Sequence, residues 1–329
     1  MGYAENGDWF SSYSGANIDN LLGCGKINLI DNAYFGYDPF PINQQGATSY
    51  TKTNGDICID RWKQYSGTVE VLDNALSIRS PAAGVVMSQK LSAGACAICR
   101  TYTACSLSVV GHADRPEKWW VRLSTDGTKL YFPELFPGYT AGCATTSVVS
   151  SSSTNNIVLE IGVDNPSGGD YLLLRAIKLE PITSILGASQ TLYVIEDSGN
   201  GPVAIEKNVP NYDEELAKCQ RYLQVFEGDA YAYLGTTYDV SSTSIEPILP
   251  LLVPMSKKTG SILASTTALL QTNGAWNQQV TIPAGSNNVR ISSNTAAFTI
   301  SLANGLLGTF PSMGAISSDG NTKIIISTE

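Results

Sequence analysis

Hydrophobic and polar residues alternate over most of the chain, which is the pattern of strands with one buried face. In TVEVLDNALSIRS, for example, Val69 and Val71 share a face, and an Asp73–Asn74 turn precedes Leu76 and Ile78. Similar runs recur in NIVLEIGV, DYLLLRAIKLE, PILPLLVP and TKIIIST. Short strands separated by polar turns predict an all-β protein built from β-sandwich domains.

The clearest hairpin lies in WWVRLSTDGTKLYF, where Asp126–Gly127 supply the two left-handed residues that a type I′ turn requires. The apolar side chains of the two strands should form the buried face. Trp120, Arg122 and Tyr131 then share the solvent face. Counted outward from a two-residue loop, the expected pairs are Ser124 with Lys129, Leu123 with Leu130, Arg122 with Tyr131 and Val121 with Phe132.

Two short helices are expected within the β pattern. Ser14 is the N-cap of the first, and Asn211 caps the second, whose first turn is acidic and favours the positive helix N-terminus. Helices this short do not hold together alone in water, so each needs a partner in its own domain or in other copies of the chain. The apolar positions are Ile18, Leu21 and Leu22 in the first helix, and Leu216 and Cys219 in the second.

Changes in the pattern divide the chain into four segments. In the last of them, Asn273–Gly274 and Asp319–Gly320 are expected as hairpin-type turns. The segments are an N-terminal attachment or trimerisation segment at 1–27, a first β-domain at 28–181, a linker or inserted hairpin at 182–211, and a second β-domain at 212–329.

The composition argues against two classes of partner, nucleic acid and anionic membranes. The 329 residues have a net charge of −9, and 20 basic residues stand scattered among 29 acidic ones. Phosphate backbones require clustered basic side chains, so nucleic acid and anionic membranes are not expected partners. The chain starts without a secretory signal and contains no apolar run long enough for a bilayer, so no membrane insertion is expected. Its seven cysteines are expected as mostly reduced thiols of a protein folded in a cytosol.

The sequence does not favour a catalytic histidine or a zinc site built from cysteines. His112 is the single histidine, so any catalytic Ser-His-Asp or Cys-His pair must use it, and VVGHADRP is typical of a strand end and loop at the surface. Cys96, Cys99 and Cys105 superficially suggest a zinc site with His112. However, Cys96 and Cys99 would project to opposite faces of an extended strand. We expect no metal and no cofactor.

Glycoside hydrolysis would require a pair of carboxylates, and the sequence does not favour one. The nearest pairs are Asp56 with Asp60 and Glu227 with Asp229, and both look like ordinary solvated loop acids. We therefore expect no catalytic residue.

Sugar binding requires flat aromatic faces that stack on C–H surfaces, beside polar side chains that bind hydroxyl groups. The solvent face of the hairpin at 119–132 fits this requirement, as do aromatic residues of the second β-domain. The alternative for each is packing in a core or a trimer interface. The candidate carbohydrate-binding residues are Trp120, Arg122, Tyr131, Tyr231, Tyr233, Tyr238 and Trp276.

Several segments resemble one family. EELAKCQRYLQ resembles the EELALCQRYYQ segment of many tail-fibre and receptor-binding proteins of phages and prophages. INLIDNAYFGYDPFPINQQGATSY is similar to their NLLDNSDFRNPVNQRGQTSY opening, GDICIDRWKQYSGTVEVLDNALSI to the YTIDRWR segment that follows, RAIKLE to the PKLE strand, and YSGANIDNLL to SGAEIDERLDKV. The matches keep a common order over residues 13–226. The chain departs in the longer stretch between KLE and EELAKCQRY, and in NQQG for NQRG.

The resemblance implies a virion appendage subunit, normally a homotrimer, assembled in the cytoplasm of a host bacterium. It implies that residues 28–181 form a jelly roll similar to carbohydrate-binding modules, with Trp62 of IDRW as a structural residue, and that the second β-domain meets the host surface. Both helical stripes would pack at a three-fold axis. The N-terminal segment would attach to other virion proteins.

We therefore expect a non-catalytic phage tail fibre or receptor-binding protein that trimerises and adheres to a bacterial surface glycan. Three alternatives stay open. They are a capsid-attached head fibre or decoration protein with the same modules, the fibre of a tail-like bacteriocin, and a depolymerase that cuts the glycan.

Overall fold

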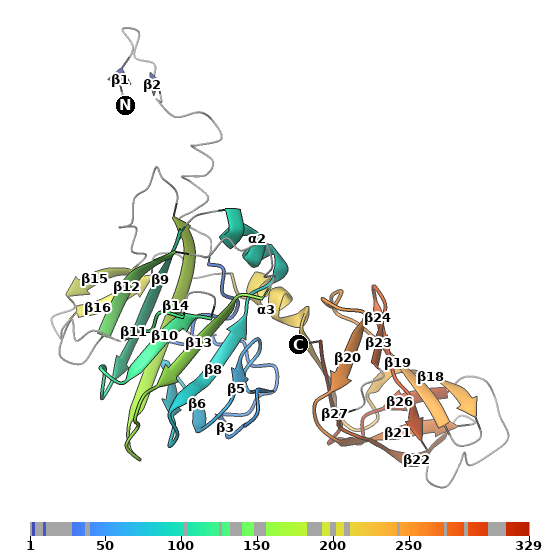
Figure 1. Cartoon of the computed structure of the whole chain (residues 1–329). Coiled ribbons are helices and arrows are strands. Elements are labelled where there is room, and N and C mark those ends of the chain that lie inside the picture. Colours follow the sequence, from blue (N-terminus) through green and yellow to red (C-terminus); the bar gives the residue numbers. More distant parts are fainter. Residues whose placement is uncertain are drawn as a thin grey trace. The chain divides into compact units, whose positions relative to one another are not determined.

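The protein is all-β, as the alternation predicts, over the residues that its computed structural model describes (Figure 1). Within these residues every strand pairing is antiparallel, and two helices of nine residues occur, α2 (Ala93–Thr101) and α3 (Tyr212–Gln220). The first predicted helix, with Ile18, Leu21 and Leu22, lies outside the described residues. The described residues are 2–3, 9–10, 28–36, 40–101, 104–124, 127–131, 140–147, 156–182, 193–197, 202–206, 211–241, 244–272, 275–285, 289–301 and 314–328.

The chain divides into two compact units. The first comprises residues 1–41, 47–58 and 62–211, and the second comprises 42–46, 59–61 and 212–329. The main division, between Asn211 and Tyr212, falls where the pattern begins the second β-domain. The sequence assigned residues 42–46 and 59–61 to the first domain, whereas they cluster with the second unit.

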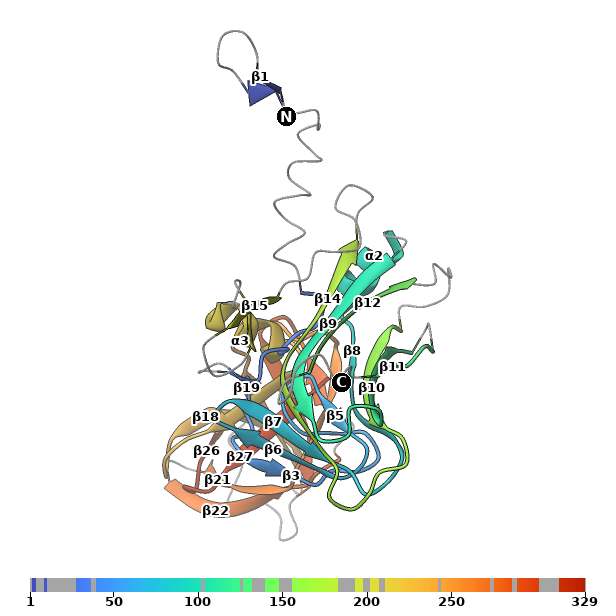
Figure 2. The same cartoon turned by 90° about the vertical axis from the view of Figure 1, so that its left-hand side faces the viewer.

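The first unit contains two six-stranded sheets (Figure 2). Both sheets contribute buried apolar side chains, such as Leu76 and Ile78 from one and Val121 and Leu123 from the other, and these form the core of the unit. One sheet has the order β11 (Leu130–Tyr131), β10 (Trp119–Leu123), β13 (Val158–Val163), β8 (Gly84–Lys90), β5 (Lys63–Gln64) and β4 (Asp56–Ile57). The other has the order β12 (Thr140–Ser147), β9 (Ala104–Ala113), β14 (Tyr171–Ile182), β7 (Ala75–Arg79), β6 (Thr68–Leu72) and β3 (Ser49–Tyr50).

Two small hairpins also belong to the first unit. β1 (Gly2–Tyr3) pairs with β2 (Trp9–Phe10), and β15 (Tyr193–Asp197) pairs with β16 (Pro202–Glu206). The second hairpin lies in the segment at 182–211, for which a linker or an inserted hairpin was expected.

The hairpin of β10 and β11 has a different register from the predicted one. Trp120 pairs with Tyr131 and Val121 pairs with Leu130, and the N–H of Gly127 donates to the Leu123 carbonyl at 3.0 Å. The loop is therefore longer than two residues, and the register is shifted by two. Because a shift of two preserves the alternation of faces, Trp120 and Tyr131 still share one face.

Helix α2 replaces the strand that was expected around Cys96 and Cys99. The N–H of Ala95 donates to Ser92 Oγ at 3.2 Å, so Ser92 caps the helix N-terminus. Cys96 and Cys99 are spaced by one helical turn and are both fully buried. The prediction that they point in opposite directions is wrong, because a capped, alanine-containing segment forms a helix here.

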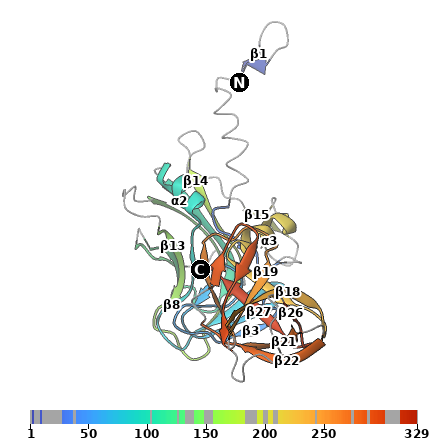
Figure 3. The ribbon, with the colours of Figure 1, turned by 90° about the vertical axis from the view of Figure 1, so that its right-hand side faces the viewer.

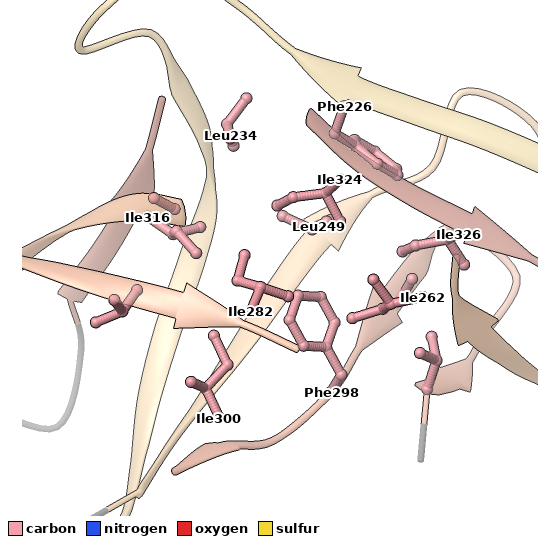
Figure 4. Close-up of a cluster of buried hydrophobic side chains, with 14 of the residues drawn as sticks. Phe226, Leu234, Leu249, Ile262, Ile282, Phe298, Ile300, Ile316, Ile324 and Ile326 are labelled. Carbon is pink, nitrogen blue, oxygen red and sulfur yellow. The ribbon is translucent and has the colours of Figure 1, made fainter. Parts of the chain in front are cut away.

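The second unit is a single eleven-stranded antiparallel arrangement (Figure 3). Its core includes Phe226, Leu234, Leu249, Ile282 and Phe298 (Figure 4). Its order is β17 (Leu223–Glu227), β27 (Lys323–Ser327), β20 (Thr259–Ile262), β23 (Val289–Ile291), β24 (Thr295–Ala297), β19 (Ser244–Pro250), β18 (Tyr233–Ser241), β26 (Gly314–Ser317), β21 (Thr266–Thr272) and β22 (Ala275–Ile282), with β25 (Ile300–Ser301) beside β19.

The two turns predicted in this unit have different outcomes. Thr272 pairs with Ala275, so β21 and β22 form the expected hairpin across residues 273–274. Asp319–Gly320 lies in a turn, with a left-handed Gly320, but the strands on either side do not pair with each other. β26 pairs with β18, whereas β27 pairs with β17. The turn therefore connects two strands that are not neighbours in the sheet.

Candidate functional site

The tyrosine loop, residues 227–233, comprises the last residue of β17, the connection at 228–232 and the first residue of β18 in the second unit. Among the side chains that the structure describes, those of Tyr231 and Tyr233 are the most exposed of any aromatic residue, at 62% and 60%. Phe226 and Leu234, on either side of the loop, are both buried in the core (Figure 4). The loop therefore presents two aromatic side chains to solvent from two well-anchored ends.

Tyr231 has an unusual backbone conformation, with a φ of 68°. A left-handed conformation costs energy in a residue with a side chain, so the surroundings must hold it. Its N–H donates to the Ser318 carbonyl at 2.7 Å, and the N–H of Ser318 donates to the Ala232 carbonyl at 2.9 Å. These two hydrogen bonds fix the loop to the turn after β26.

Ser318 also holds the loop through its buried side chain. Its hydroxyl donates to the Gly228 carbonyl at 2.6 Å and accepts from the N–H of Gly320 at 3.0 Å. Gly228 has no room for a side chain, because a Cβ there would lie 2.6 Å from the Ala232 Cβ. The backbone below the two tyrosines is therefore closely packed, which restricts the conformations that the loop can adopt.

Asp319 fixes the neighbouring turn. Its carboxylate accepts hydrogen bonds from Thr267 Oγ1 at 2.6 Å, the N–H of Asn321 at 2.9 Å and Gln279 Nε2 at 2.9 Å. These bonds, that of Thr267 first, hold the pKa of Asp319 far below its ordinary range. The carboxylate is therefore ionised at neutral pH and serves as an acceptor, not as a proton donor.

The second aromatic cluster, on β10 and β11, is covered by charged side chains. Trp120 is 1% exposed, and the Arg122 guanidinium and Lys129 ammonium lie 4.9 and 4.8 Å from its ring centroid. The prediction that Trp120 lies on the solvent face is therefore corrected, because these cations cover its ring. Tyr131 shares the face and is 44% exposed.

Asp164 connects the residues of this hairpin. It accepts hydrogen bonds from Trp120 Nε1 at 3.1 Å, Lys129 Nζ at 2.7 Å and the Tyr131 hydroxyl at 2.8 Å. Burial raises the pKa of this carboxyl, but the hydrogen bonds outweigh burial and hold the pKa below its ordinary value. Arg122 pairs with Glu160 at 2.6 Å. These charges are matched in pairs, which is typical of a structural network.

The remaining predicted residues are placed as follows. Tyr238 lies in β18 and Trp276 in β22, and their side chains lie outside the described part of the structure. In α3, Leu216 is partly exposed, whereas Cys219 is fully buried within the chain. A contact between copies at this helix would therefore use Leu216, because the surface of Cys219 is already covered.

Three family-like segments meet in the second unit, although they are far apart in sequence. Gln44, from NQQG, donates through Nε2 to Asp60 Oδ2 at 2.8 Å and to the Leu223 carbonyl at 3.0 Å. Arg61, from IDRW, lies 3.6 Å from the ring centroid of Tyr222 in QRYLQ. The resemblance identified these segments one by one along the sequence, and the folded structure brings them into contact.

Asp60 is the buried carboxyl of this cluster. It was expected to be a solvated loop acid, and this prediction is wrong, because Asp60 is fully buried whereas Asp56 is exposed. Burial raises its pKa to about 7, although the hydrogen bonds from Gln44 act in the opposite direction. Sequence spacing could not show this burial, since it depends on contacts with residues far along the chain.

Two of the residues considered for catalysis have ordinary polar neighbours. His112 lies near the end of β9, and its Nε2 is 3.5 Å from the Tyr171 hydroxyl. Glu227 pairs with Lys323 at 3.1 Å at one end of the tyrosine loop. Within the described ranges, no group of three or more His, Cys, Asp or Glu side chains is placed to hold a metal ion.

Comparisons with known proteins gave no match, either to a family model or to a curated protein. Among the helices in the described part of the chain, none has the length and apolar character needed to cross a membrane.

Proposed function

We propose that the chain is a non-catalytic subunit of a phage or prophage appendage, a tail fibre or receptor-binding protein, that trimerises and adheres to a bacterial surface glycan. Support comes from the all-β fold, from the resemblance over residues 13–226, and from the meeting of three of the resembling segments around Gln44, Asp60 and Tyr222.

The exposure of Tyr231 and Tyr233 is the observation that carries the binding role. Aromatic rings at 62% and 60% exposure, on a loop fixed by Ser318, are suited to stacking on the apolar C–H face of a sugar. Each such contact is weak. A trimer would combine three of them, and effective concentration would convert weak single contacts into useful avidity.

Tyrosine variants of the full chain test the binding role. The protein is screened against an array of bacterial surface polysaccharides, and Tyr231→Ala and Tyr233→Ala are then compared on the best ligand. Each substitution is expected to weaken single-site affinity by about tenfold, which corresponds to about 1.4 kcal/mol of lost stacking.

Tyr131→Ala is the matched control, because Tyr131 is an exposed tyrosine of the rival hairpin cluster. It should leave affinity unchanged. If Tyr131→Ala abolishes binding and the loop variants do not, the binding face lies on the first unit. If no polysaccharide binds, the adhesive role is contradicted.

The trimer is tested by light scattering of the full-length chain at micromolar concentration. The expected mass is near three times 35.0 kDa. A monomer would contradict the fibre assignment and would favour a decoration protein that assembles only on its particle.

A further inference from the structure

Helix α2 and strand β9 bring two cysteine side chains together in the first unit. Cys99 lies in the last turn of α2, and Cys105 is the second residue of β9. Their sulfur atoms are 3.8 Å apart, and both side chains are fully buried. α2 lies at the end of the sheet at which β9 begins (Figure 1). The contact thus joins a short helix to the second strand from the edge of that sheet.

The neighbouring Cys96 is arranged differently. It shares the buried face of α2 with Cys99, but its thiol donates to the Leu91 carbonyl at 3.8 Å, towards the start of the helix. The thiol of Cys105 instead donates to the sulfur of Cys99, which lowers the pKa of Cys99. Cys99 is therefore the thiol of this pair that is better prepared to lose its proton.

We propose that Cys99 and Cys105 are an oxidative modification site that a low-molecular-weight disulfide, such as oxidised glutathione, converts into an intrachain disulfide. The sulfur atoms must close from 3.8 Å to about 2.0 Å. Cys99 lies in the last turn of α2 and Cys105 is the second residue of β9, so small side-chain rotations and small shifts of these two element ends can supply this movement.

The reaction is balanced by thiol–disulfide exchange. Both sulfur atoms are fully buried, so the exchange takes place when the short helix α2 opens locally and exposes Cys99. The thiolate of Cys99 then attacks one sulfur of oxidised glutathione, forms a mixed disulfide and releases one glutathione thiolate. Cys105 then loses its proton and attacks the Cys99 sulfur, which forms the protein disulfide and releases the second glutathione. The protein loses two electrons and two protons in total, and the oxidant is reduced to two thiols.

Peptide mapping of the full-length protein tests this site. The reduced protein is freed of reductant, incubated with oxidised or reduced glutathione, denatured, alkylated and digested with trypsin without reduction. Arg100 lies between the two cysteines, so trypsin places them in separate peptides, 91–100 and 101–118. The expected result is a linked pair of these peptides in the oxidised sample, together with a mass loss of about 2 Da for the intact chain.

Single substitutions identify the sulfur atoms. In Cys105→Ser the linked peptides should disappear and a glutathione adduct should remain on peptide 91–100. Cys96→Ser should leave the linkage unchanged. The proposal is overturned if Cys96→Ser removes the linkage while Cys99→Ser retains it, if oxidation links separate chains instead, or if both thiols of the wild type are alkylated after oxidation.

Discussion

Trp120 owes its burial partly to a residue without a side chain. Gly162 lies opposite Trp120 in β13, and a Cβ at Gly162 would lie 2.3 Å from Trp120 Cζ2 and 2.4 Å from the Gly84 carbonyl oxygen. The glycine lets the indole ring lie against the sheet while cations cover its other parts. The burial of this aromatic ring therefore depends on a neighbouring strand as well as on its own.

Gly162→Ala should destabilise the protein by about 1–3 kcal/mol, because a rigid ring and a backbone carbonyl must move. Urea unfolding measures the change. Gly168→Ala is the control, since a Cβ at Gly168 has no neighbour within 4 Å, and its effect should stay within about 0.5 kcal/mol. Equal effects of the two substitutions would contradict the packing described for Trp120.

Asp60 makes stability depend on pH. Its pKa is raised from 3.8 to about 7, so the native state favours the protonated carboxyl. The stability that this group contributes is fully present below pH 3.8 and is lost as the pH rises through about 7. Asp60→Asn removes this titration.

The stability of Asp60→Asn relative to the wild type should therefore rise with pH, by up to about 1.4 kcal/mol per pH unit in that range. Urea unfolding at about pH 5 and about pH 8 measures both proteins. Because the other titrating groups are common to both, their contributions cancel in the difference. A constant difference would show that Asp60 does not titrate in this range.

At the scale of elements, helix α2 depends on its N-cap. The Ser92 hydroxyl accepts from the N–H of Ala95, and the Ser92 carbonyl accepts from the N–H of Cys96. Three alanines also favour a helix in this short segment. The cap fixes where the helix begins and so contributes to the orientation of Cys96 and Cys99.

Ser92→Ala should lower stability by about 1 kcal/mol, because one helix N–H loses its partner. Ser92→Asp retains an acceptor and should cost much less. Thermal unfolding followed by circular dichroism compares the two. A similar loss in both variants would show that the hydroxyl does not act as a cap.

Elements with a repeated signal could be predicted from sequence, and those fixed by distant contacts could not. The β6–β7 turn at Asp73–Asn74 lies where the alternation places it, with Leu72 paired to Ala75. The register of β10 and β11 depends on loop length, which Asp126–Gly127 did not determine. The conformation of Tyr231 depends on its hydrogen bond to Ser318, and the surroundings of Asp60 depend on its hydrogen bond with Gln44. No local sequence pattern connects either residue to its partner.

At the scale of the whole molecule, the second unit is not continuous in sequence. Gln44 binds the Leu223 carbonyl, and Lys323 Nζ donates to the Gln45 carbonyl at 2.7 Å. Both contacts join residues 42–46 to strands of the second unit, and residues 59–61 belong to the same unit. β17 and β27 are thus supported by residues encoded far upstream.

A fragment of residues 212–329 should be less stable than the same residues in the full chain, because it lacks these contacts. Hydrogen–deuterium exchange followed by mass spectrometry measures the difference. Faster exchange is expected for amides of β17 and β27 in the fragment. Identical protection in the two proteins would show that residues 42–46 and 59–61 contribute little.

The discontinuity of the second unit restricts how it can be transplanted. A chimera joined at residue 211 would move the eleven strands but would leave Gln44, Asp60 and Arg61 in the donor chain. The recipient would then have to supply two loops of matching sequence at the right spacing. Recombination at this single point can therefore yield a well-folded protein only between chains that already share both loops.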